Sequence, residues 1–258
     1  IDDMQLAGQG KAETLVTNMI EAAVDLSQVI EQTLGSQISL PKAALVSSST
    51  EVSKRVRSAL KDKAGLEVHI SKNLGIDCSA GRARPYHASK ATRHKRCRSI
   101  LPRVNRLKRL QKAGARTTGR IFNTGFKPQA TFGCEVHGLS NGELHKLQKA
   151  AVACYPPFGM GKSKTLMLLA HGDPLAKPAV AAMHRWSVEV WKAANQKDSR
   201  AFSLPQLRAN WEASIGHKSK DSWRTARGPM AIARLEASRI GWSFQGPFKL
   251  VNSTGTAI

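Results

Sequence analysis

Two adjacent carboxylates stand at the beginning of the chain, where Asp2 and Asp3 follow Ile1 and precede a small, apolar stretch at residues 4–8. Enzymes that transfer phosphoryl groups with two divalent cations, about 3.5–4 Å apart, hold them with such hard oxygen ligands. The pair is therefore a candidate metal site on a β-hairpin. Adjacent Asp residues also occur in solvated turns and helix caps, so the interpretation depends on the rest of the sequence.

Basic residues give the chain a formal net charge of +22, and they are unevenly distributed. Residues 78–155 carry a net charge of +15 and residues 156–258 one of +9, whereas residues 1–77 carry −2. Between Cys78 and Cys134 there is no acidic residue. Such a charge favours a polyphosphate partner, because each neutralised phosphate releases condensed counterions. A disordered basic linker and a membrane-surface patch are alternatives.

The densest basic run has the periodicity of a helix over residues 89–111. Its apolar positions recur at three- and four-residue steps and form one stripe: Ile100, Leu101, Val104, Leu107 and Leu110. The other side is cationic and consists of Arg98, Arg103, Arg106, Lys108, Arg109 and Lys112. This pattern predicts a helix that packs its apolar stripe on a core and offers its cationic side to phosphates.

Several other chemistries are disfavoured. The segment 159–163 (GMGKS) resembles a phosphate-binding loop, but Pro156 stands where that motif requires Gly, and residues 144–154 predict a helix and not a strand. The four cysteines contain no C-x-x-C pair, which argues against a zinc ribbon or a disulfide framework and fits a reducing compartment. His87, His94 and Cys97 lack a fourth metal ligand nearby. No run of 18 apolar residues and no secretory signal are present.

The pattern of apolar and polar residues predicts an α+β, mostly helical fold, whose helices and strands would position the candidate site residues. Helices are expected at residues 13–34, ended by Gly35, and at 48–60; a strand broken by Pro41 is expected at 38–46, and two short strands or a hairpin at 68–76. Ser140 and Glu143 form a capping box for the next helix. Further helices are expected from Asp173, over 203–215 and over 229–240. All five tryptophans lie beyond residue 155, at positions expected to be core, which suggests a separate helical part.

The order of these landmarks resembles the C-terminal half of a reverse transcriptase of the non-LTR retrotransposon type. The Asp pair is followed by an amphipathic helix, by ISLPKAALV at residues 38–46, by SKNLGI at 71–76, by the basic segment and by TFGCEVHGLS at 131–140. The resemblance covers residues 1 to about 155. It implies a partial palm at 1–77, a basic thumb-like segment at 78–155 and a Trp-containing helical extension at 156–258.

The resemblance also implies roles for individual residues. Asp2 and Asp3 would bind two Mg²⁺ ions together with an upstream palm Asp that this chain lacks, and Lys42 would approach the departing phosphates. Lys72, Leu74 and Gly75 would hold the primer, and the cationic side of 98–112 would track the template–primer backbone. The chain departs from the family pattern at Phe132, where the family has Tyr.

We therefore expect a fragment of an RNA-directed DNA polymerase that acts on an RNA template, a DNA primer and dNTPs in the nucleus or cytoplasm, with no membrane partner. The fragment alone is expected to be inactive. The alternative is a non-catalytic, basic nucleic-acid-binding remnant of a retroelement, in which Asp2 and Asp3 are ordinary turn residues. A third interpretation is a structural basic protein of a ribonucleoprotein particle.

Overall fold

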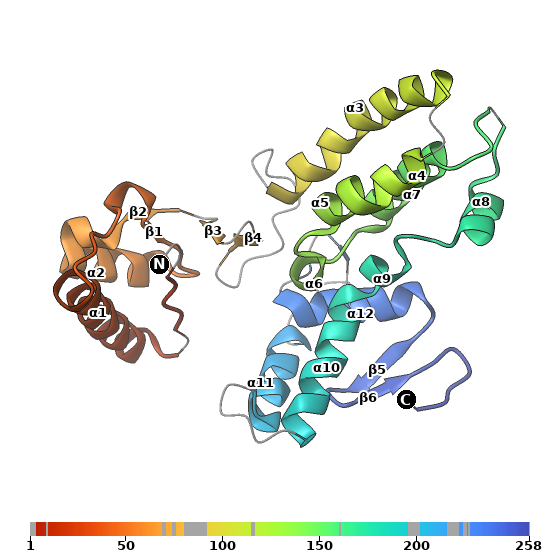
Figure 1. Cartoon of the computed structure of the whole chain (residues 1–258). Helices are drawn as coiled ribbons and strands as arrows, with labels where there is room; N and C mark the ends of the chain where they lie inside the picture. Colours follow the sequence, from red (N-terminus) through yellow and green to blue (C-terminus); the bar gives the residue numbers. More distant parts are fainter. Residues whose placement is uncertain are drawn as a thin grey trace. The chain divides into compact units, whose positions relative to one another are not determined.

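The computed structural model describes residues 4–8, 10–68, 71–73, 76–79, 92–114, 117–159, 161–195, 202–215, 222–223, 226 and 228–257, without the side chains of 62, 72, 73, 93 and 94. The chain is α+β and mostly helical, as expected (Figure 1). It divides into two compact units, Ile1–Pro85 and Tyr86–Ile258. The boundary expected at 155/156 falls inside the second unit.

Two helices form the core of the first unit. The helix α1 (Ala12–Gln28) continues into a π-helical turn, η1 (Val29–Thr33), and ends near Gly35, whose φ is +60°. The helix α2 (Thr50–Leu60) begins at Ser49, whose Oγ accepts a hydrogen bond from the backbone N–H of Val52. Val16 of α1 is buried against Val52 and Val56 of α2. Both predicted helices are confirmed.

The strands of this unit are shorter than expected. Residues 38–46 form a 3₁₀ turn, η2 (Leu40–Lys42), and only then the strand β1 (Ala44–Leu45), because Pro41 has a fixed φ and no N–H to donate. Lys42 therefore lies on a turn. After another 3₁₀ turn, η3 (Lys61–Ala64), the strand β2 (Leu66–Glu67) pairs with β1 in parallel. The strands β3 (Ser71–Asn73) and β4 (Ile76–Cys78) form an antiparallel hairpin, one of the two alternatives expected for residues 68–76, but it begins and ends later in the chain than expected.

The second unit begins with a helical layer. It contains α3 (Thr92–Lys112), α4 (Thr118–Ile121), the π-helical turn η4 (Phe122–Phe126), α5 (Lys127–Thr131), α6 (Cys134–His137), α7 (Asn141–Cys154) and α8 (Lys164–His171). Phe122, Leu139, Leu147 and Cys154 belong to its core. The predicted capping box is present: the backbone N–H of Glu143 donates to Ser140 Oγ, and Ser140 N–H donates to Glu143 Oε2.

A second core follows in the same unit. It is built by α9 (Ala176–Ala179), α10 (Ala181–Asn195), α11 (Leu204–Ile215), α12 (Gly228–Arg239) and the antiparallel strands β5 (Ser243–Gly246) and β6 (Lys249–Val251). The helix expected from Asp173 is displaced, because Asp173 Oδ1 accepts a hydrogen bond from Leu175 N–H and closes a turn there. Trp211 is buried, but Trp191 is exposed, which contradicts its expected place in the core.

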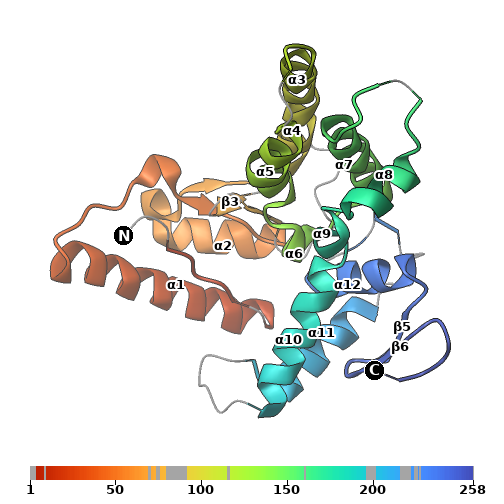
Figure 2. The ribbon, with the colours of Figure 1, turned by 45° about the vertical axis from the view of Figure 1, so that its right-hand side comes forward.

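The two cores are joined through α6 and the segment after it, which lie beside α12 and α10 (Figures 1 and 2). Gly138 follows α6 directly and approaches Ile232 of α12 so closely that a Cβ there would be 2.4 Å from Ile232 Cγ2. The Arg239 guanidinium donates to the carbonyls of Leu139 and Ala179 and to Asn141 Oδ1. These contacts connect the basic helical layer to the Trp-containing part.

Candidate nucleic-acid interface

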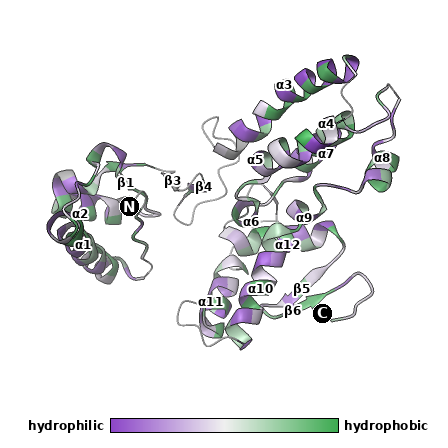
Figure 3. Ribbon diagram, in the orientation of Figure 1, coloured by the Kyte–Doolittle hydropathy of each residue, from purple (hydrophilic) through white to green (hydrophobic). Residues whose placement is uncertain are grey.

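The helix α3 is the most basic element described, and it is mostly hydrophilic along its length (Figure 3). It buries Ile100, Val104 and Leu107, whose spacing of four and three residues puts them on one side. Leu101 and Leu110, expected in the same stripe, are 52% and 48% exposed. At about 100° per residue each lies on a flank of the helix, and not above the core. The apolar stripe is therefore narrower than the sequence suggested.

Five predicted cations point into solvent from this helix. They are exposed and form no ion pair with any residue that the structure describes; we call them the α3 basic face: Arg98, Arg106, Lys108, Arg109 and Lys112. Because α3 is fixed by its buried side, its outer side holds these charges in a fixed array. Such an array suits contacts with a phosphate backbone.

Arg103, the sixth predicted cation, differs from the other five. Its guanidinium is half-buried and donates a hydrogen bond to Gln129 Oε1 of α5. Arg103 thus joins α3 to α5, and in this it differs from the five cations of the α3 basic face; its predicted contact with phosphates stays a prediction. The sequence separation of 26 residues between the two partners explains why local periodicity did not indicate the contact.

The segment after α7 brings a further cation, Lys162, close to Lys108 of the α3 basic face. Lys162 Nζ donates to the carbonyl of Tyr155 at 2.9 Å and lies 5.6 Å from the centroid of the Phe158 ring. Burial lowers the pKa of Lys162; nearby Cys154 raises it, and the positive charge of Lys108 on α3 lowers it. This GKS segment is not a phosphate-binding loop, because helix α7 precedes it and its lysine folds back onto the chain.

A second aromatic ring lies beside the other half of α3. Phe132, between α5 and α6, is 48% exposed, and the guanidinium carbon of Arg96 lies 4.8 Å from the centroid of its ring. Sequence reasoning did not assign a role to Phe158, Phe132 or Lys162. The feature of the sequence that could have indicated them is the presence of aromatic residues close to a run of Arg and Lys.

The other predicted site residues are not brought together in the described part of the chain. Asp2, Asp3, Leu74 and Gly75 lie outside the described residues, as does the side chain of Lys72, whose backbone pairs with Asp77 in the β3–β4 hairpin. Lys42 is exposed on η2. Within the residues described, no three His, Cys, Asp or Glu side chains form a group that could hold a metal ion. His87 and the His94 side chain are outside them.

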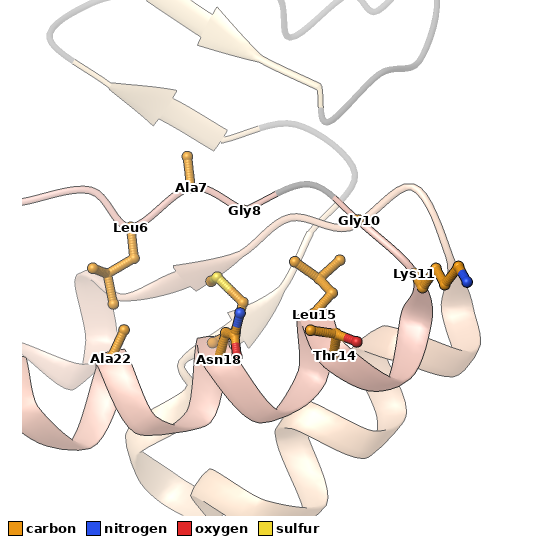
Figure 4. Close-up of a pocket in the computed structure, with 10 residues that line it drawn as sticks. Leu6, Ala7, Gly8, Gly10, Lys11, Thr14, Leu15, Asn18 and Ala22 are labelled. Atoms are coloured by element: carbon orange, nitrogen blue, oxygen red, sulfur yellow. The ribbon is translucent and has the colours of Figure 1, made fainter.

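A pocket of about 360 Å³ lies in the first unit, between the N-terminal segment and α1 (Figure 4). Its lining mixes the apolar side chains of Leu6, Leu15, Met19 and Ala22 with the polar ones of Lys11, Thr14 and Asn18. A Cβ at Gly8 would come within 2.6 Å of Leu15 Cδ1, so this segment packs closely on the helix. None of the predicted site residues lines the pocket, and it offers no acid–base pair.

In the part of the chain that is described, every helix is too short or too polar to span a bilayer. No protein-family model, curated protein or solved structure matches the chain.

Proposed function

We propose that the second unit binds the sugar–phosphate backbone of a nucleic acid through the α3 basic face, as the thumb part of an RNA-directed DNA polymerase. The observation that carries the proposal is the array of five exposed cations without an ion-pair partner among the described residues. Binding a phosphate there breaks no salt bridge between described residues. The gain from released counterions is then not offset by the loss of an ion pair.

The composition of the face also supports contacts with the sugar–phosphate backbone. Arg and Lys supply all five charges, and these side chains are frequent partners of phosphate oxygens. We therefore expect grip with little sequence preference and a strong dependence on salt.

The polymerase part of the proposal rests on residues of the first unit. Asp2 and Asp3 are carboxylates, the donor type that Mg²⁺ prefers, and would hold the ions with the upstream Asp that the resemblance implies. Bound Mg²⁺ neutralises charge on the phosphates during nucleotidyl transfer. Lys42 would add a positive charge near the departing phosphates. Lys72, Leu74 and Gly75 would hold the primer, and Lys72 belongs to the strand β3 of the β3–β4 hairpin.

The second candidate is a nucleic-acid-binding protein without catalysis. It is favoured by the same basic face, because that face needs neither Asp2 nor Asp3. The two functions share the binding activity and differ in whether the carboxylates act in DNA synthesis.

One experiment tests both parts, in an enzyme that joins this chain to its upstream palm. Binding of an RNA–DNA duplex is measured against salt, and Mg²⁺-dependent primer extension is measured in parallel. The double variant Arg106→Gln/Arg109→Gln should weaken binding on the order of tenfold and reduce the slope of log K against log salt by about two. Asp2→Asn should abolish extension and leave binding unchanged.

Matched controls separate local effects from net charge. Lys177→Gln/Lys249→Gln removes two exposed charges outside α3, and Asp25→Asn removes an exposed carboxylate of α1. Both controls should behave like the parent enzyme. If Lys177→Gln/Lys249→Gln weakens binding as much as Arg106→Gln/Arg109→Gln does, the effect comes from net charge, and α3 is not the binding surface. Normal extension by Asp2→Asn would leave only the non-catalytic function.

A further inference from the structure

Basic side chains also meet where the helix α8 begins beside α7. Lys164 Nζ of α8 lies 3.2 Å from His145 Nδ1 of α7 and donates a hydrogen bond of 3.2 Å to Gln148 Oε1. Gln148 and Lys149 follow His145 by three and four residues, so α7 presents all three side chains on one side. We call His145, Lys149 and Lys164 the α7–α8 cluster.

A chain of hydrogen bonds holds the Lys164 ammonium in place. Gln148, which accepts from Lys164, donates through Nε2 to Asp173 Oδ2 at 2.7 Å. Asp173 Oδ1 in turn accepts from the backbone N–H of Leu175, a residue fully buried in the first core. The lysine side chain has therefore lost part of its freedom before any ligand arrives, which lowers the entropic cost of binding one.

The contact between Lys164 and His145 determines where the imidazole carries its proton. An ammonium group donates hydrogen bonds and cannot accept them, so His145 Nδ1 is the acceptor and the ring proton is on Nε2. The positive charge of Lys164, desolvation and the positive charge of Lys149, in this order, lower the pKa of His145. The exposed ring is thus a neutral donor beside two ammonium groups.

Carboxylates do not neutralise this cluster in the described structure. Between Glu143 and Asp173 the sequence has four lysines and no acidic residue. Both Asp173 oxygens accept the hydrogen bonds given above, and Glu143 Oε2 accepts from Ser140 in the capping box. The three cluster residues form no ion pair with any described residue. A set of donors with positive charge and no acid suits an oxyanion.

We propose that the α7–α8 cluster binds a phosphate monoester, the dianionic group found at the end of a nucleic-acid strand and on a free nucleotide. The oxyanion takes the place of the hydrogen bond between Lys164 and His145. Both side chains then donate to it, His145 through Nδ1 after taking up a proton from solvent, and Lys149 adds its charge from the next turn of α7. A monoester has three terminal oxygens and can accept from all three groups at once.

The first measurement is an NMR titration of the histidine rings of the full chain with sodium sulfate, a tetrahedral dianion whose charge does not change near neutral pH. The His145 signal is assigned by its loss in His145→Gln. Sulfate should shift this signal to saturation and raise the pKa of His145 by about one pH unit or more, because a nearby negative charge favours imidazolium. His184, exposed on α10, is the internal control and should show no saturable shift.

Four variants distinguish a built site from diffuse attraction. Lys164→Gln should weaken sulfate binding on the order of tenfold, and Lys149→Gln, at an exposed position that the fold does not need, should weaken it several-fold. Gln148→Leu keeps every positive charge and removes the group that orients Lys164, so it should also weaken binding several-fold. Lys177→Gln removes an exposed charge of α9 and should have no effect.

The source of the phosphate is distinguished with a nucleoside 5′-monophosphate and with a trinucleotide that carries either a 5′-phosphate or a 5′-hydroxyl. Both monoesters should bind more tightly than the 5′-hydroxyl strand, which has only diesters. Equal affinity of the two monoesters indicates recognition of the phosphate group alone, as on a free nucleotide. Tighter binding of the phosphorylated trinucleotide indicates the end of a strand.

Three outcomes would overturn the inference. If the His145 signal responds to sulfate no more than that of His184, the cluster does not bind an oxyanion. If Lys177→Gln weakens binding as much as Lys164→Gln, the attraction is due to net charge. If the 5′-hydroxyl strand binds as tightly as the phosphorylated one, the ligand is not a monoester. None of these results bears on the α3 basic face, since the cluster shares no residue with it.

Discussion

Glu236 of α12 is a carboxylate inside the second core. Its side chain is fully buried, its Oε2 accepts a hydrogen bond from Met183 N–H at 3.0 Å, and its Oε1 has no hydrogen-bond partner in the described structure. Because Met183 lies in the first turn of α10, Glu236 caps that helix from a neighbouring one. Burial raises the pKa of Glu236 to about 7, although the Met183 hydrogen bond and the charge of Arg239 lower it.

This raised pKa predicts a dependence of stability on pH. Between pH 4.5, the usual pKa, and about 7 the folded state keeps a proton that the unfolded state has released. The free energy of unfolding should therefore be highest below this window and fall as the pH rises through it, by up to about 3 kcal/mol. Glu236→Gln, which keeps the shape and an oxygen acceptor, should remove this fall. Urea unfolding at pH 5 and pH 8 measures it.

The pH dependence of the free energy of unfolding is compared between Glu236→Gln and the parent protein, because the histidines of both titrate in the same pH range. Glu189→Gln serves as a control variant with a partly buried carboxylate in α10 that is paired to Arg185 and Lys192. An identical pH dependence in Glu236→Gln and the parent protein would mean that Glu236 does not hold the proton.

At the scale of elements, the junction between α6 and α7 decides how the two layers of the second unit meet. Gly138 has φ +57°, a conformation that L side chains rarely adopt, and a Cβ there would come within 2.9 Å of Trp223 Cζ3 in addition to the contact with Ile232. Only glycine lets α6 turn at this point and touch α12. The Arg239 guanidinium, 4.6 Å from the centroid of Trp223, closes the same junction.

Gly138→Ala should therefore destabilise the second unit by about 2–4 kcal/mol, from backbone strain together with overpacking. Gly142→Ala is the matched control, because Gly142 lies four residues further on in α7, and a Cβ added there meets nothing within 4 Å. That change should be neutral or stabilising by up to about 1 kcal/mol. Thermal unfolding of the two variants gives the comparison; equal midpoints would show that the junction has room for a side chain.

At the scale of the molecule, the second unit has two cores that share the junction around Gly138 and Arg239. The sequence suggested a separate part beyond residue 155. The contacts across the junction instead favour cooperative unfolding of residues 86–258. All five tryptophans lie in the second half of this unit, and all but the exposed Trp191 belong to the second core or pack against it, so their fluorescence reports mainly that core.

Leu107→Ala should lower the urea midpoint seen by tryptophan fluorescence, although Leu107 belongs to the first core. The cavity should cost about 2–5 kcal/mol, and cooperativity should transmit this loss to the tryptophans. Leu110→Ala, at a half-exposed position of the same helix, should change the midpoint little. If Leu107→Ala leaves the fluorescence midpoint unchanged, the two cores unfold independently.

Local chemistry was enough to predict much of this fold. Periodicity located α1, α2, α3, α11 and α12, and the Ser140–Glu143 box located the start of α7, because caps and apolar stripes act within one or two turns. The site was predicted in part for the same reason, since helical spacing identified the five cations of the α3 basic face. The Asp2–Asp3 site and the polymerase activity remain predictions.

Tertiary structure alone decided which side chains around α3 are buried, paired or exposed. It exposed Leu101 and Leu110, tied Arg103 to Gln129, and left Phe132 and Phe158 partly exposed, each beside one cation. These outcomes depend on partners that are distant in sequence, and periodicity cannot indicate which flank of a helix a neighbour will cover. Composition and local order therefore determined that this chain carries a basic helix on a core, and long-range packing determined which of its charges are available to a ligand.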